Sequence, residues 1–281
     1  MKFKGKHLYE INPTFYEIIL QKEICKRYVK NLFSKDKIAK TKQEERLPNI
    51  VSSRNSNLIK RAKGIDIRTQ EGKATNIKIA GSKINGIIIH PGEVFSFWQT
   101  VGKAKKKKGY QEGRLIVGKE LTTGIGGGLC NLGNTIHWMV LHSPLEVVEF
   151  HKHSDALAPD HGKREPFSSG TSVCYNMVDY KFKNNTDQDV QLIIWCENEK
   201  LYGELRSEKE FPYTYELVEE DHHFQKEGDK YYRVSKIYKQ ITDRKTGKII
   251  GKELVLDNHS EVMFDYSLIP QEQIRDEKVL V

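Results

Sequence analysis

The stretch best suited to chemistry places three glycines directly before a thiol. Gly126–Gly128 and Leu129 precede Cys130, and an apolar run then continues until Ser143–Pro144 stops it. The apolar residues of this run recur with a period near 3.6, which predicts a helix beginning at Leu129–Cys130. Unpaired backbone N–H groups and the positive end of the macrodipole gather at a helix start, and both lower the pKa of a cysteine there.

Two interpretations of this junction stay open. In the first, Cys130 is a nucleophile, and Gly126–Gly128 leave room for a substrate backbone and for an exposed N–H group in an oxyanion hole. In the second, the glycines form a tight turn into the helix, and Cys130 fills the core beneath it.

A nucleophilic cysteine needs a base, and half of the ten histidines lie between positions 137 and 161. Two of these share the helix of Cys130 but lie about 10 Å or more along its axis. His151 and His153 lie two residues apart, on one face of a predicted strand. Either His153 or His151 could reach Cys130 from an adjacent strand. We take His153 as the candidate base and Asp179, on a later strand, as the carboxylate that orients it. This order of residues suits a papain-like or transglutaminase-like arrangement, by analogy of fold only.

The same residues do not predict a metal site. One Cys with a distant His-x-His pair lacks an established ligand spacing, so we predict no metal and no cofactor. The other cysteines, Cys25, Cys174 and Cys196, are widely spaced without a CxxC pair. We interpret them as small buried hydrophobes.

The elements that position these residues predict an α+β fold. Residues 71–86 place apolar side chains on one helical face and end at Asn85–Gly86, a helix-stop signal. Residues 146–153, 173–182 and 190–196 alternate apolar and polar side chains, as strands do. The sequence therefore predicts N-terminal helices followed by a largely antiparallel sheet, with the helix at Leu129–Cys130 packed on it.

The positive charge is concentrated at the N-terminus. Residues 1–63 carry a net charge of +10, whereas the remaining residues carry −2. Residues 14–33 combine apolar side chains at helical spacing with interleaved lysines, which predicts a basic amphipathic helix. We expect this helix to pack its apolar face on the domain, with contact to an anionic membrane surface as the second interpretation. No recognition motif accompanies the charge, so nucleic acid is not an expected partner.

The start of the chain lacks the pattern of a cleaved signal peptide, and no apolar run approaches the ~18 residues of a membrane span. We therefore expect a cytoplasmic protein, peripheral at the inner face of the membrane in the second interpretation of residues 14–33.

Four segments resemble the VanW family: HPGEVFSFWQTVG, GIGGGLCNLGNT, EFHKHSD and DYKFKNNT. The resemblance is best between about Asn76 and Arg206. The family motif reads GGGxCQxS, followed by a His-Ser pair and a D-x-x-F-x-N strand. Here the motif supplies Cys130, His153 and Asp179, but Asn131 replaces the usual Gln. A Gly170–Val173 segment, GTSV, also stands where most members have D-A-T-V, so we place the candidate carboxylate at Asp179.

This resemblance implies an accessory protein of glycopeptide (vancomycin) resistance, without implying a reaction. We expect a basic N-terminal helical segment and connector at 1–63, a VanW-like core domain at 64–206, and a β-rich C-terminal extension at 207–281.

Two functional hypotheses follow. The first is a cysteine-dependent amidase, peptidase or acyl transferase acting on peptidoglycan or its precursors. Its catalytic residues would be Cys130, His153 and Asp179, and its substrate-binding residues would be Gly126, Gly127, Gly128, Asn131 and His151. The alternative is a non-catalytic module that binds a peptidoglycan or precursor fragment. Thiol reactivity separates the two, because only an activated Cys130 alkylates well below pH 8.

Overall fold

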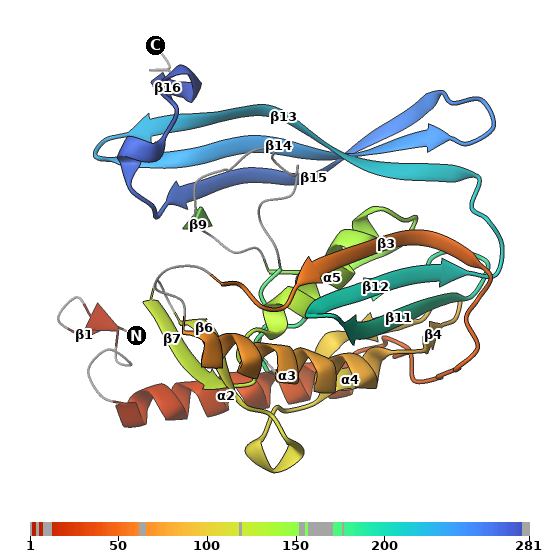
Figure 1. Ribbon diagram of the computed structural model, residues 1–281, viewed down its shortest axis with the longest axis horizontal. Coiled ribbons are helices and arrows are strands. Elements are labelled where there is room, and N and C mark those ends of the chain that lie inside the picture. The colour runs from red at the N-terminus through yellow and green to blue at the C-terminus, as the bar shows by residue number, and fades with distance from the viewer. Residues whose placement is uncertain are drawn as a thin grey trace.

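The computed structural model of the chain consists of helices and mostly antiparallel sheets (Figure 1). The α+β class predicted from the sequence is confirmed. The structure describes residues 2–3, 6–7, 13–61, 66–117, 120–151, 155–156, 171–175 and 177–276.

The main sheet has four antiparallel strands, which in spatial order are β3 (Asn49–Asn57), β12 (Lys200–Ser207), β11 (Val190–Glu197) and β4 (Ile87–Ile89). The helices α3 (Ile67–Ile84) and α5 (Leu129–Leu141) pack on it. Two glycines permit close contact: a Cβ at Gly81 would lie 2.9 Å from Ile194 Cγ2, and one at Gly203 would lie 2.8 Å from Met139 Cε. The apolar face of each helix is thereby buried in the largest hydrophobic core, as its period predicts.

A smaller antiparallel sheet contains β5 (Val94–Ser96), β10 (Lys181–Lys183) and β8 (Glu146–Glu149), and β5 leads into α4 (Phe97–Val101). The prediction that segments 146–153, 173–182 and 190–196 share one sheet is therefore wrong. Phe182 of β10 stacks on Phe95 of β5, with ring centroids 5.0 Å apart. Asn184 then binds the Ile89 and Gln188 carbonyls, and this turn directs the chain into the main sheet.

A hairpin of β6 (Glu112–Val117) and β7 (Glu120–Ile125) leads directly into the glycine loop before α5. A short helical turn, η1 (Lys106–Lys108), precedes this hairpin.

The C-terminal region forms a sheet whose spatial order is β16 (Ile274–Asp276), β13 (Tyr213–Glu227), β14 (Lys230–Asp243), β15 (Ile249–Val262) and β9 (Asp155–Ala156). Figure 1 shows it as a separate layer above the main sheet and α5. Leu217, Ile237 and Leu256 of this sheet form one cluster with Leu141 at the end of α5. The turns η2 (Tyr266–Leu268) and η3 (Gln271–Gln273) lie between β15 and β16.

The N-terminal region contains a pair of short strands, β1 (Lys2–Phe3) and β2 (Lys6–His7), and the helix α2 (Pro13–Phe33). The expectation that α2 packs its apolar face on the domain is wrong, because Val29, Leu32 and Phe33 are exposed. The segment interpreted as a connector also contributes β3, whose backbone pairs with β12 in the main sheet. None of the helices in the described part of the chain is long and apolar enough to cross a bilayer.

Candidate functional site

Cys130 is the second residue of α5, at the helix start that the sequence predicts. Its Sγ donates a hydrogen bond to the Val173 carbonyl at 3.7 Å, and its side chain packs against the main core. Burial raises the pKa of the Cys130 thiol, although backbone hydrogen bonds oppose the change. The pKa of Cys130 therefore shifts in the direction opposite to that expected, because desolvation outweighs these hydrogen bonds.

The protein's own atoms occupy the space that the glycines leave. A Cβ at Gly127 would lie 2.1 Å from the carbonyl oxygen of Gly113, so only glycine allows the loop to cross β6 there. A Cβ at Gly128 would lie 2.1 Å from Cγ of Lys73, and the φ angle of Gly128 is +90°. These close approaches account for the glycines without a substrate.

The loop is also fastened from α3. Asn76 donates from Nδ2 to the carbonyls of Gln111 and Gly127, both at 3.0 Å, and its Oδ1 accepts the Gln111 N–H. Gly126 has a φ angle of +82°, and a Cβ on it would lie 2.6 Å from Ala104 Cβ. The glycine loop is thus a packed junction between α3, β6 and α5.

Two further candidate residues form structural contacts. Asn131 Oδ1 accepts the Ser56 hydroxyl at 2.8 Å, which ties the start of α5 to β3. Asp179 accepts the Ser96 hydroxyl at 2.6 Å and the N–H groups of Trp98 and Tyr180 at 3.0 and 2.9 Å. Burial raises the pKa of Asp179, while the hydrogen bond from Ser96 opposes this shift. The carboxylate therefore organises the first turn of α4.

The assignment of His153 as the base for Cys130 remains a prediction, because His153 lies outside the described residues. The structure instead pairs His151 Nε2 with Glu149 Oε1 at 3.1 Å, and Arg27 binds both oxygens of Glu149. Burial would raise the pKa of Glu149, but the hydrogen bonds from Arg27 and His151 outweigh it and lower the pKa to about 2. The sequence analysis missed Glu149, although its position two residues before His151 on a strand signals a shared face.

A single segment connects this histidine with the thiol. The Ser172 N–H donates to the His151 carbonyl at 2.7 Å, and the next residue, Val173, accepts from Cys130. His151 and Cys130 are therefore both neighbours of segment 171–175.

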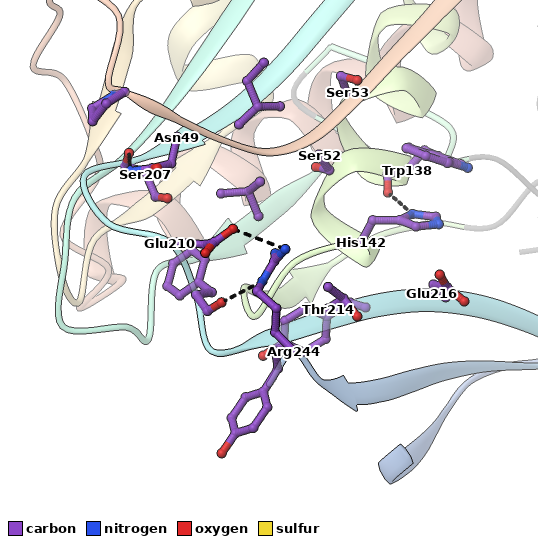
Figure 2. A pocket seen from close by; sticks show the side chains of 16 residues that line it. Asn49, Ser52, Ser53, Trp138, His142, Ser207, Glu210, Thr214, Glu216 and Arg244 are labelled. Atoms are coloured by element: carbon purple, nitrogen blue, oxygen red, sulfur yellow. Dashed lines mark hydrogen bonds and ion pairs between the residues drawn. The ribbon is translucent and has the colours of Figure 1, made fainter. Parts of the chain in front are cut away.

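A cleft of about 510 Å³ opens at the other end of α5 (Figure 2). It lies between residues 48–53, the last turn of α5, and the first part of β13 with its preceding turn, and we call it the β3–β13 groove. The residues that line it are Pro48, Asn49, Ile50, Val51, Ser52, Ser53, Trp138, His142, Ser207, Glu210, Phe211, Tyr213, Thr214, Tyr215, Glu216 and Arg244.

Stacked rings form the wall of the groove that α5 supplies. The Trp138 and His142 rings stack with centroids 3.7 Å apart, and Arg54 lies 4.8 Å from the Trp138 ring. His142 Nδ1 lies 2.8 Å from the Trp138 carbonyl, and burial lowers the pKa of His142. The imidazole is therefore neutral and held in place at neutral pH.

An ion pair borders the groove on the side of the C-terminal sheet. Arg244 and Glu210 lie 3.2 Å apart, and Arg244 Nε donates to the Phe211 carbonyl at 3.3 Å. In Figure 2 the Arg244 side chain extends toward Glu210 between the labelled residues of the two walls.

Strand edges form the long sides of the groove. Among the described residues, β3 pairs only with β12, and residues 213–220 of β13 pair only with β14. A strand with one neighbour leaves the N–H and C=O groups of alternate residues unpaired along its other edge. The groove can therefore hydrogen-bond an extended chain along its length.

The sequence is similar to a known family and to two curated proteins. Residues 72–206 match the model of the VanW family, described as VanW like protein. Residues 72–206 therefore form a VanW-family domain. The chain is 29% identical to the vancomycin B-type resistance protein VanW of Enterococcus faecalis over 244 aligned residues. The alignment covers 87% of this chain and 88% of that protein. The chain is also 28% identical over 122 residues to the uncharacterized protein YoaR of Bacillus subtilis, covering 43% of this chain and 39% of YoaR. No solved structure matches significantly.

The two ends of α5 relate differently to the VanW domain. The glycine loop and Cys130 lie inside residues 72–206, whereas both strand walls of the groove lie outside them. Only Trp138 and His142 bring the VanW domain into the groove. The groove is therefore assembled by the additional strands on either side of the domain.

The remaining predictions for this region concern metals and thiols. Among the described residues, no group of three His, Cys, Asp or Glu side chains is arranged to hold a metal ion. The expectation that the chain binds no metal stays a prediction, because His153 is not among the described residues. The interpretation of the other cysteines as buried is wrong for Cys25 and Cys174, which are exposed, and Cys196 is partly exposed.

Proposed function

We propose that this VanW-family chain is an accessory protein of glycopeptide resistance that binds a peptidoglycan or precursor fragment in the β3–β13 groove without turnover. The observation that carries this proposal is the cleft of about 510 Å³ between the open edges of β3 and β13. The resistance context rests on the similarity to the vancomycin B-type resistance protein of Enterococcus faecalis.

The chemistry of the groove suits the peptide part of such a fragment. An extended peptide added to a strand edge gains main-chain hydrogen bonds, and side-chain pockets provide its specificity. The stacked Trp138 and His142 offer an apolar surface, while Asn49, Ser53 and Thr214 offer neutral polar groups. Because the Arg54 contact and the His142 stack hold Trp138 in place, ordering of this wall costs little on binding.

The experiment is a calorimetric titration of the full chain with soluble muropeptides released from peptidoglycan. Ser53→Arg adds a long side chain at an exposed position of β3 that lines the groove. Asn55→Arg is the matched control, because Asn55 is also exposed on β3 but does not line the groove.

We expect Ser53→Arg to weaken binding at least about ten-fold, the loss that follows from about 1.4 kcal/mol of blocked contacts. Asn55→Arg should bind as the unmodified chain does. No heat of binding with the unmodified chain, or equal losses in both variants, would overturn the proposal.

A second candidate function is a cysteine-dependent amidase, peptidase or acyl transferase. The observation that favours it is the His151–Glu149 pair, which contacts the same segment as Cys130. In such a reaction the base takes the Cys130 proton, the sulfur attacks an amide carbonyl carbon, and the protonated base gives the proton to the leaving amine. We rank this enzymatic function below the binding function because the pKa of Cys130 is raised and a protonated thiol is a weak nucleophile.

Its test is mass spectrometry after incubation of the chain with the same muropeptides. A cysteine enzyme would yield shortened or transferred products and an acylated Cys130 peptide. Cys130→Ala would abolish both, whereas Cys174→Ala, at a neighbouring exposed thiol, would preserve them. Products that persist in Cys130→Ala would eliminate this function for Cys130.

A further inference from the structure

The helix α2 presents apolar side chains to solvent. Leu32 and Phe33 are 80% and 78% exposed, and Ile18 and Val29 are 58% and 55% exposed. Cys25 is exposed as well. At 100° per residue these five positions fall on one side of the helix. We call Ile18, Cys25, Val29, Leu32 and Phe33 the α2 strip.

Lysines accompany the strip. Lys22, Lys26 and Lys30 are exposed and follow one another at four-residue intervals, so they form a row along one edge of the strip. Lys26 also pairs with Glu23 at 2.6 Å. An apolar surface with a row of long basic side chains beside it is the pattern of a helix that lies in a membrane interface.

The opposite side of α2 fastens the helix to the protein. Arg27 is buried and binds Glu149 and the Met177 carbonyl, and Ile24 is also buried. On the flank between this side and the strip, the Tyr28 hydroxyl lies 2.7 Å from that of Tyr175. These contacts hold the helix with its apolar strip outward, which reverses the usual arrangement of an amphipathic helix on a soluble domain.

We propose that α2 docks this protein on an anionic membrane surface, with the α2 strip entering the lipid interface and the lysine row binding acidic headgroups. Charge complementarity selects this occupant. Residues 1–63 carry a net charge of +10 while the remainder carries −2, so the charge that attracts a polyanionic surface lies in the segment that presents the strip. Lysine stems extend along apolar surface and place their ammonium groups at headgroup level.

Figure 1 shows α2 at the edge of the molecule, with the C-terminal sheet on the other side of the core. The core therefore separates α2 from the C-terminal sheet. The docking is independent of whether the groove binds a peptidoglycan fragment.

The test is co-sedimentation of the full chain with vesicles of equal parts phosphatidylcholine and phosphatidylglycerol, against vesicles of phosphatidylcholine alone. We expect binding to the anionic vesicles that weakens as salt is raised, and much weaker binding to the neutral ones. Replacement of the lysine row by Lys22→Gln, Lys26→Gln and Lys30→Gln should weaken binding at least about ten-fold.

The apolar contribution is tested by Leu32→Gln with Phe33→Gln. This pair should weaken binding on the order of 100-fold, because both side chains would leave the lipid. Ile249→Gln with Ile250→Gln is the matched control, since these β15 side chains are 62% and 54% exposed in the C-terminal sheet. The control should bind as the unmodified chain does.

Three outcomes would overturn the proposal. One is no sedimentation with anionic vesicles, and another is equal binding by the control pair and the Leu32 and Phe33 variants. The third is a dimer in sedimentation equilibrium that Leu32→Gln with Phe33→Gln dissociates while lipid binding is absent, which would assign the strip to a second copy of the chain.

Discussion

The two ends of α5 differ in what surrounds them. At its N-terminal end, the glycine loop is crossed by the β6 backbone and covered by Lys73, and the Cys130 thiol donates to a carbonyl. At its C-terminal end, Trp138 and His142 border a cleft between two open strand edges. The end with the conspicuous motif is packed by the protein itself, and the end without a motif can receive a ligand.

This difference shows what a glycine run means physically. Glycine permits close approach of any group, and a protein's own backbone is as good a candidate as a substrate.

The largest expected effect is at Gly127. Gly127→Ala should lower the free energy of unfolding by about 3 kcal/mol or more, because the new Cβ would meet the Gly113 carbonyl oxygen at 2.1 Å. Gly251→Ala is the control: its Cβ would have ordinary contacts at 3.6 Å or more, so the change should be within about 0.5 kcal/mol. Urea unfolding measures both. An unchanged stability for Gly127→Ala would mean that the N-terminal end of α5 is open.

The next effect concerns the ion pair beside the closed end. Arg27→Met should lower the free energy of unfolding by about 3 kcal/mol at pH 7, because it leaves the largely buried carboxylate of Glu149 with His151 as its remaining partner. The control is Arg61→Met, which removes an equally bidentate but exposed pair with Glu199 and should change stability little.

The same pair predicts a pH dependence. The pKa of Glu149 is lowered to about 2 in the folded chain, so its contribution is complete above the unfolded pKa near 4.5. That contribution is lost as pH falls from about 4.5 toward 2. Thermal unfolding of Arg27→Met should show a smaller loss over this range than the unmodified chain, and equal losses would contradict the assignment.

The smallest effect is on thiol chemistry. At pH 8, iodoacetamide should modify Cys130 at least about ten-fold more slowly than Cys25, since burial raises the pKa of Cys130 while Cys25 is exposed. Peptide mass spectrometry resolves the two rates. Faster labelling of Cys130 would show an activated thiol and restore the catalytic interpretation.

The sequence predicts what depends on local pattern. The start of α5 at Leu129 and the end of α3 before Gly86 both follow from period and turn residues. The resemblance of residues 72–206 to the VanW family was visible in the residues around Cys130 and Asp179. These signals are local because helix and turn formation involve neighbouring residues.

What the sequence did not predict depends on contacts between distant segments. The role of Asp179 is set by Ser96, which lies 83 positions earlier. The partner of Glu149 is Arg27, 122 positions away, and an amphipathic pattern does not say which face of α2 turns inward. The groove likewise joins β3, α5 and β13, whose residues have no shared motif.

Hydrogen exchange of the full chain with and without soluble muropeptides compares the two ends of α5 directly. The account predicts slower exchange of backbone N–H groups at residues 49–53 and 213–216, which form the strand walls of the groove. Residues 126–130 should exchange at the same rate in both samples. Protection at residues 126–130 with none at the groove walls would contradict the account and place the ligand at Cys130.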